Sequence, residues 1–126
     1  MKINTIQFGE VEFDAANTIT FAEGILGFEN LKTFLLIKTD DQLFYWLNSI
    51  EKPDIAFPMV GVRVIDENFP EQSGNEAFAI VTLSKDPLKI TANLKAPVYI
   101  NQDEKSGFQK VIDSDKYPVK FNLFKA

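Results

Sequence analysis

The sequence predicts an all-β fold: one small barrel-like domain of about ten short, mostly antiparallel strands with almost no helix. Short β-branched or aromatic runs recur roughly every 8–12 residues, separated by Gly, Pro, Asn and Asp turns. Apolar residues alternate with a period of two rather than at helical spacing. No repeat, linker or low-complexity tract interrupts the chain, so we expect residues 1–126 to form a single domain with a single core.

The composition is that of a globular protein and excludes several kinds of chemistry. Hydrophobic residues make up 45% of the chain and charged residues 25%. The sequence has no Cys and no His, which excludes disulfides, Cys/His zinc sites and the commonest general base. A net charge of −5 disfavours direct nucleic-acid binding and suits a basic partner. We see no secretory signal and no apolar run of roughly 18 residues, so a cytoplasmic protein without a membrane segment is expected.

The first 21 residues predict a hairpin and a short strand. Acidic and apolar residues alternate over residues 10–14, as in a strand with one buried face. A turn near Phe8-Gly9-Glu10 would pair this strand with residues 2–7. Ile19 and Phe21 follow on one face of the next strand.

A bent apolar loop comes next. Gly24 and Gly27 bracket Ile25 and Leu26, and Phe28 follows. Glycine allows backbone angles that other residues avoid, so the loop can turn sharply. Either Ile25 and Phe28 plug the loop into the core, which we favour, or a partner covers an exposed apolar loop. The spacing does not fit a nucleotide-binding loop.

The middle of the chain predicts three paired strands, over residues 33–39, 43–50 and 55–65. A polar turn, Asp40-Asp41-Gln42, joins the first two. The second has large apolar residues on both faces, which places it centrally. Pro58 in the third strand indicates an edge or a bulge, because proline has no N–H to donate.

Residues 66–76 predict an exposed polar loop in which Phe69 is the exception. Further strands are expected over residues 77–83, 108–112 and 119–124.

The segment Thr91–Asn101 is predicted to contain a strand with a turn at each end. Pro97 fits the start or edge of a strand, and the apolar residues after it favour extended backbone. The Asn93 side chain should bond backbone in the preceding turn, and Asn101 should begin the next turn.

The residues themselves indicate no catalysis. The paired acids all lie in predicted turns, where carboxylates are usually solvated, and a calcium loop of the known pattern is missing. We therefore predict no catalytic residue, no metal site and no cofactor.

A series of short motifs follows in a fixed order: Phe21-x-x-Gly24-Ile25-x-Gly27-Phe28, Phe34-x-Leu36-Ile37, Trp46-Leu47-x-Ser49, Pro53-x-Ile55-Ala56-Phe57, Ile80-Val81-Thr82, Ala92-Asn93-Leu94-x-Ala96-Pro97-x-x-Ile100-Asn101, and Gly107-x-Gln109-x-Val111 before Tyr117. In this order they resemble the flagellar assembly factor FliW family over nearly the whole chain. The sequence departs from the family pattern at Val62, where a proline is expected.

The resemblance implies a cytoplasmic, non-enzymatic protein with a barrel-like fold. It also implies two mutually exclusive partners, flagellin and the RNA-binding translational repressor CsrA. Before export flagellin occupies the family member; afterwards the free protein binds CsrA and relieves repression of flagellin translation. We expect a monomer that contacts neither nucleic acid nor membrane.

Two loops are candidate partner surfaces, because each combines apolar residues with acids that would attract a basic partner. The first holds Glu23, Ile25 and Phe28, and the second holds Asp66, Glu67, Phe69 and Glu71. The motif residues expected to be structural are Gly24, Gly27, Asn93, Pro97 and Asn101.

An alternative is a small β-barrel enzyme or ligand carrier. Its polar pocket would be lined by Arg63, Glu23 and the pair Asn93 and Asn101. A deep polar cavity would favour this alternative, whereas a filled barrel with an exposed apolar patch would favour the binding protein.

Overall fold

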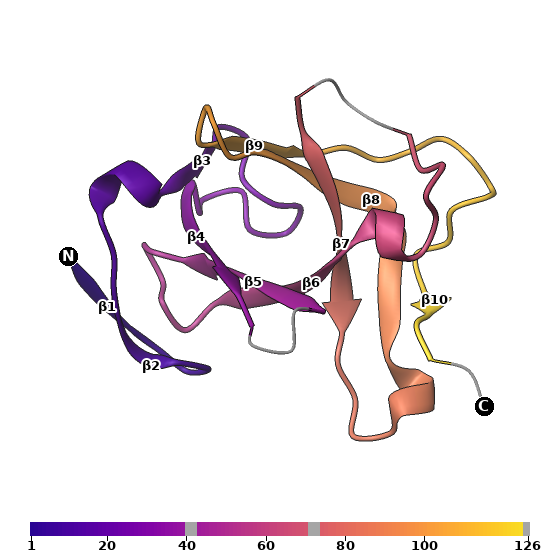
Figure 1. The fold of residues 1–126 in the computed structure, drawn as a ribbon, viewed down its shortest axis with the longest axis horizontal. Coiled ribbons are helices and arrows are strands. Elements are labelled where there is room, and N and C mark those ends of the chain that lie inside the picture. The colour runs from indigo at the N-terminus through magenta and orange to yellow at the C-terminus, as the bar shows by residue number, and fades with distance from the viewer. Residues whose placement is uncertain (40–42, 71–73, 125–126) are drawn as a thin grey trace.

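The computed structural model describes residues 1–39, 43–70 and 74–124, and it confirms an all-β, barrel-like fold (Figure 1). Helical structure in these residues is limited to three short 3-10 turns. The strands are β1 (Lys2–Thr5), β2 (Gly9–Glu12), β3 (Ile19–Phe21), β4 (Thr33–Lys38), β5 (Phe44–Ser49), β6 (Ala56–Gly61), β7 (Glu76–Thr82), β8 (Thr91–Asn101), β9 (Ser106–Gln109) and β10 (Phe121–Asn122). The 3-10 turns are η1 (Ala15–Asn17), η2 (Val62–Val64) and η3 (Pro87–Lys89).

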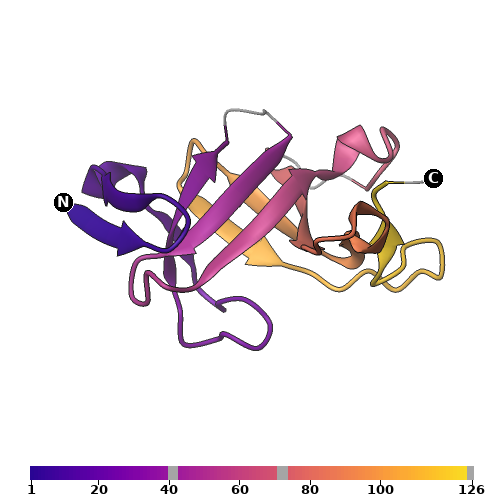
Figure 2. The same cartoon turned by 90° about the horizontal axis from the view of Figure 1, so that it is seen from below.

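The main sheet closes into a barrel. Its strands follow the order β8-β7-β6-β5-β4-β3-β9, and β9 pairs back onto β8. All of these pairs are antiparallel except β3 with β9. Strand β10 joins β8 outside the ring, and the β1–β2 hairpin is a separate two-stranded sheet. In both views this hairpin and β10 lie at opposite ends of the molecule (Figures 1 and 2).

The predicted N-terminal hairpin is confirmed, with its turn at residues 6–8. The Thr5 hydroxyl holds this turn, because it donates to the Gly9 carbonyl and accepts from the Phe8 N–H, both at 2.9 Å. Gly9 has a φ of 65°, which glycine adopts readily. The Phe8 ring meets the Trp46 ring edge-on at 6.1 Å and so fastens the hairpin to β5.

The expectation of a single core is wrong, because the apolar side chains form two clusters. The first fills the barrel and contains Ile19, Phe21, Ile25, Leu31, Phe34, Leu47, Met59, Phe78, Val98 and Ile100. The second contains Val60, Val62, Phe69, Ala79, Val81, Ala92, Leu94 and Tyr117. Strand β8 is long enough to serve both: its C-terminal half pairs with β9, and its N-terminal half pairs with β10.

The strand expected over residues 55–65 ends early, because β6 stops at Gly61 and η2 follows. Strand β6 is not an edge, since it pairs with both β5 and β7. Pro58 is nevertheless tolerated because it lies opposite Trp46 of β5, whereas pairing with β7 begins only at Met59. The missing N–H of Pro58 therefore costs no bond in the ladder with β7.

The turn predicted before Pro97 is also wrong, because β8 continues through it. Phe78 pairs with Val98 but Ile80 pairs with Asn93, so five residue steps of β8 match two of β7. The excess residues form a bulge, which Asn93 holds: its Oδ1 accepts from the N–H groups of Lys95 and Ala96, both at 3.0 Å. The predicted backbone bonding by Asn93 is thus confirmed in a bulge instead of a turn.

The turn predicted at Asn101 is confirmed. The Asn101 Oδ1 accepts from the N–H groups of Asp103 and Glu104, both at 3.0 Å. The turn predicted at Asp40-Asp41-Gln42 lies outside the described residues.

Candidate protein-binding surface

The bent loop between β3 and β4 is a tight, well-bonded structure. Gly24 is buried with a φ of 69°, and a Cβ there would lie 2.7 Å from the Cα of Glu29. Gly27 has a φ of 86°, and just after it the Phe28 N–H donates to the Ile25 carbonyl at 2.7 Å. The sequence motif is explained by these positions, because a side chain at Gly24 would clash with backbone and a positive φ disfavours other residues.

The loop is plugged into the barrel by one residue and presents two others to solvent. Ile25 is 2% exposed and belongs to the barrel cluster, so its side chain is not on the surface. Phe28 is 38% exposed and Leu26 is 59% exposed. The Phe28 ring rests edge-on against the Phe57 ring at 5.1 Å. The favoured expectation that both Ile25 and Phe28 are buried is therefore right for Ile25 and wrong for Phe28.

Two exposed acids flank these apolar side chains. Glu23 lies at the start of the loop, and the Glu29 Oε1 accepts from the Gly27 N–H at 3.2 Å. A hollow of about 480 Å³ lies between this end of the loop and the turn before β6, lined by Gly27, Phe28, Glu29, Asn30, Leu31, Lys52 and Ile55. We define Glu23, Leu26, Phe28 and Glu29 as the bent-loop surface.

Gln109 fixes the bent loop to the rest of the barrel. Its Oε1 accepts from the Leu26 N–H at 2.9 Å, and its Nε2 donates to the Ala96 carbonyl at 3.0 Å. One side chain thereby joins the loop to the β8 bulge. The sequence interpretation gave Gln109 no role, although it stands in one of the family motifs; a polar side chain at an inward position of a strand was the available signal.

The second candidate loop does not present the aromatic anchor that the sequence predicted. Phe69 is 3% exposed, and its ring packs on the Tyr117 ring at 4.6 Å. Phe69 therefore belongs to the second cluster, and its buried ring is not accessible to a partner. Asp66 is partly buried, Glu67 is exposed, and Glu71 lies outside the described residues.

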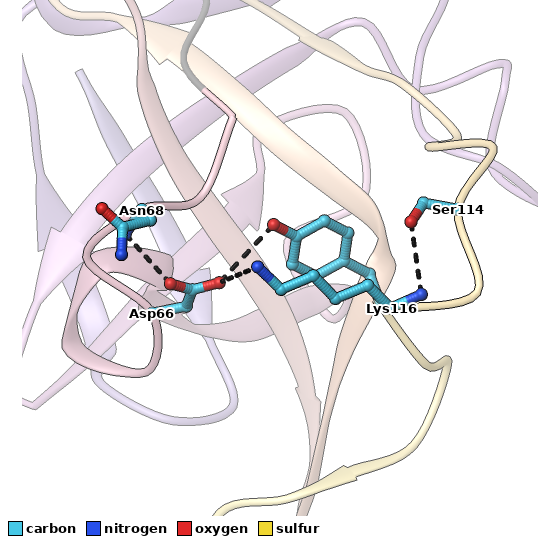
Figure 3. A network of polar contacts seen from close by, with 5 residues as sticks. Asp66, Asn68, Ser114 and Lys116 are labelled. Atoms are coloured by element: carbon cyan, nitrogen blue, oxygen red, sulfur yellow. Dashed lines mark hydrogen bonds and ion pairs between the residues drawn. The ribbon is translucent and has the colours of Figure 1, made fainter.

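Asp66 is engaged in a network with the C-terminal segment (Figure 3). Its carboxylate accepts from the Asn68 N–H at 2.9 Å and from the Tyr117 hydroxyl at 3.5 Å. The Lys116 Nζ lies 3.6 Å from the same carboxylate. Nearby Tyr117 and Asp66 both raise the pKa of Lys116, because each favours its charged form. This arrangement offsets the acidity of the loop and ties it to residues 114–117.

The residues of the alternative polar pocket are used elsewhere. The side-chain oxygens of Asn93 and Asn101 both accept hydrogen bonds from neighbouring backbone N–H groups. Arg63 lies on η2 and lines a small hollow together with Glu76, and Glu23 belongs to the bent loop. The barrel interior is filled by apolar side chains. Over the residues described, the structure brings no three acids together as a metal site. No helix in those residues has the length and apolarity to cross a membrane.

Comparison with known proteins identifies relatives along nearly the whole chain. The family model described as "FliW protein" matches residues 2–77 and 68–123. The flagellar assembly factor FliW of Caldicellulosiruptor saccharolyticus is 38% identical, with 93% of this chain and 86% of that protein covered. The flagellar assembly factor FliW of Clostridium botulinum is also 38% identical, over 99% of this chain and 98% of that protein.

A solved structure shares the fold. The crystal structure of the flagellar assembly factor FliW superposes with a TM-score of 0.90 and covers 100% of this chain and 99% of that one. Its sequence identity is 24%, so this likeness concerns the fold alone.

Proposed function

This chain belongs to the FliW family, and from that premise we propose that it is a cytoplasmic flagellar assembly factor that acts by binding proteins and catalyses no reaction. Its proposed partners are flagellin and the translational repressor CsrA, bound one at a time. While flagellin occupies the protein, CsrA is left to repress flagellin translation. When flagellin has been exported, the protein binds CsrA and the repression ends.

The observation that carries this proposal is an exposed apolar loop held rigidly on a filled barrel. Leu26 and Phe28 are presented to solvent by a loop that two positive-φ glycines and Gln109 fix in place. A preorganised loop loses little conformational freedom on binding, which favours affinity. Over the described residues, apolar side chains fill the barrel, which supports a protein-binding role over an enzyme or ligand carrier with an internal polar pocket.

We assign CsrA to the bent-loop surface on grounds of charge. A protein that grips RNA phosphates is basic where it does so. Glu23 and Glu29 flank the apolar side chains of this loop, and the whole chain carries a net charge of −5. Acids around an apolar anchor accelerate encounter with a basic partner and oppose RNA on the same partner.

The test compares two single substitutions of similarly exposed leucines. Leu26→Ser removes the apolar side chain from the bent loop, where Leu26 is 59% exposed, and Leu88→Ser does the same on η3, where Leu88 is 48% exposed. Titration calorimetry with purified CsrA should show weakened binding for Leu26→Ser and wild-type binding for Leu88→Ser. Equal affinities of both variants for CsrA would show that CsrA does not bind the bent-loop surface. No binding by the wild type would refute CsrA as a partner.

A further inference from the structure

The turn between β5 and β6, residues 50–55, is held in place by two polar side chains at the end of β5. Asn48 and Ser49 are both fully buried. The Asn48 Nδ2 donates to the Pro53 carbonyl at 3.1 Å, and the Ser49 Oγ accepts from the Lys52 N–H at 3.0 Å. Because a buried polar group that loses its hydrogen bond costs free energy, these bonds keep the turn in one position.

The Glu51 side chain joins this turn to the C-terminal end of the bent loop. Its carboxylate accepts from the Thr33 N–H at 2.8 Å and from the Lys32 N–H at 3.0 Å. Next to them, the Ile50 N–H donates to the Thr33 carbonyl at 3.0 Å, so Glu51 continues the bonding between β5 and β4 toward the loop. A carboxylate accepts N–H bonds more strongly than a neutral acceptor does.

Lys32, which Glu51 holds, also joins the two arms of the bent loop. Its carbonyl accepts from the Phe21 N–H at 2.7 Å, and its Nζ donates to the Ala22 carbonyl at 3.1 Å. Both arms therefore meet at one residue, and the position of that residue helps to determine where the bent-loop surface lies.

The β5–β6 turn also lies beside the exposed part of the loop. Lys52 and Ile55 line the hollow of about 480 Å³ together with Phe28 and Glu29 of the loop. The Phe28 ring rests on Phe57, which follows the turn in β6. The turn and the loop are thus neighbours at two places, at the Glu51 carboxylate and at the Phe28 ring.

We propose that Glu51 is a positioning residue for the bent-loop surface and holds the loop, through Lys32, where that surface binds CsrA. The inference rests on the proposed function, which assigns CsrA to this surface. A loop already held in its binding position loses less conformational freedom when a partner binds, so its affinity is higher. Gln109 holds the same loop from the other side at Leu26, so two parts of the barrel fix it.

Three single substitutions test this role by titration calorimetry with purified CsrA. Glu51→Ala removes the acceptor of the Lys32 and Thr33 N–H groups, whereas Glu51→Gln keeps a neutral acceptor. Glu104→Ala is the charge control, because it removes an exposed acid from the turn between β8 and β9. We expect Glu51→Ala to weaken binding by about fivefold, the effect of ordering part of a loop on binding. Glu51→Gln should lie nearer the wild type, and Glu104→Ala should bind as the wild type does.

A double-substitution cycle separates positioning from direct contact. Glu51→Ala is combined with Leu26→Ser, which removes an apolar side chain that the loop presents. If Glu51 acts through the loop, Glu51→Ala should weaken binding less in the Leu26→Ser background than in the wild type. The same loss in both backgrounds would show that Glu51 acts independently of the loop and would overturn the inference.

Hydrogen exchange gives a readout that does not depend on CsrA. The Phe28 and Leu31 N–H groups bond within the loop, to the carbonyls of Ile25 and Phe28. Both should exchange faster in Glu51→Ala than in the wild type, while the amides that Asn93 holds in the β8 bulge should be unchanged. Unchanged exchange in the loop, or faster exchange in loop and bulge alike, would refute positioning of the loop by Glu51.

The outcomes separate this inference from the proposed function. If the wild type binds CsrA and Glu51→Ala binds equally well, the inference is overturned and the proposed function stands. An equal loss in Glu51→Ala and Glu104→Ala would reflect net charge alone and would also overturn it. If the wild type does not bind CsrA, both fall.

Discussion

Gln109 accepts a hydrogen bond from the Leu26 N–H at 2.9 Å, so a strand of the barrel determines where the exposed bent loop lies. The same side chain bonds Ala96 in the β8 bulge. At its other end β8 pairs through Ala92 with Phe121 of β10. The bent loop and β10 are therefore both attached to one strand, β8.

Replacing Gln109 should loosen the bent loop. Gln109→Ala removes both bonds and should cost about 1–2 kcal/mol of stability, since each bond contributes roughly 1 kcal/mol. CsrA affinity should fall as well, because the loop would have to be ordered on binding. Gln109→Glu keeps an acceptor for the Leu26 N–H, so its CsrA affinity should stay nearer the wild-type value. Calorimetry with CsrA that ranks Gln109→Glu below Gln109→Ala would contradict this role.

Asn93 should be needed for the bulge in β8. Asn93→Ala leaves the N–H groups of Lys95 and Ala96 without their acceptor and should lower the free energy of unfolding by about 1–3 kcal/mol. Asn93→Asp keeps the accepting oxygen and is the control. Urea unfolding measures both variants. An alanine variant as stable as wild type would show that the bulge does not depend on this side chain.

Phe69 should matter for stability instead of partner contact. Phe69→Ala empties a buried site against Tyr117 and should cost about 3–5 kcal/mol. Glu67→Ala, at an exposed neighbour in the same loop, should stay within roughly 0.5 kcal/mol of wild type. Thermal unfolding compares the two. Similar melting temperatures for Phe69→Ala and wild type would mean that Phe69 is not part of the second cluster in solution.

Tyr99 should make the fold sensitive to alkaline pH. Burial, and secondarily Tyr117, raises the pKa of Tyr99 above its ordinary value of 10.0. A raised folded-state pKa gives stability that is complete below the unfolded pKa and is lost as pH rises through the folded one. Unfolding free energy should therefore decline above pH 10. Lys116 adds a loss of the same sign, since its pKa is raised from 10.5.

Tyr99→Phe isolates the Tyr99 contribution. The variant loses the 3.2 Å bond from the Tyr99 hydroxyl to the Pro70 carbonyl, so at neutral pH it should be less stable by about 1 kcal/mol. Its decline in unfolding free energy above pH 10 should be shallower than that of the wild type. Denaturant titrations at several pH values measure both effects. If the unfolding free energy of the variant and the wild type declined equally steeply above pH 10, Tyr99 would not be a source of the alkaline sensitivity.

The positions of most strands along the chain were predictable, because these strands carry a local pattern. Ile19 and Phe21 share a buried face, and large residues on both faces of β5 placed it between two neighbours. Gly24 and Gly27 likewise indicated a loop with unusual backbone angles. Such features depend on residues close together in sequence, which is where periodicity and turn preferences act.

Other features depend on contacts between distant residues and left no local signal. Phe69 stands in a polar loop, and its buried site is formed by residues far from it in sequence, among them Tyr117. The bulge in β8 arises from its pairing with β7, so the residues around Asn93 looked like a turn. The division into two clusters follows from the length of β8 and the partners at its two ends.

Competition between flagellin and CsrA is the most direct test of the proposed function. Wild-type protein saturated with purified flagellin is mixed with CsrA, and the complexes are separated by size-exclusion chromatography coupled to light scattering. We predict that flagellin prevents CsrA binding and that removing flagellin restores it. A stable ternary complex of the protein with flagellin and CsrA together would refute exclusive binding of the two partners.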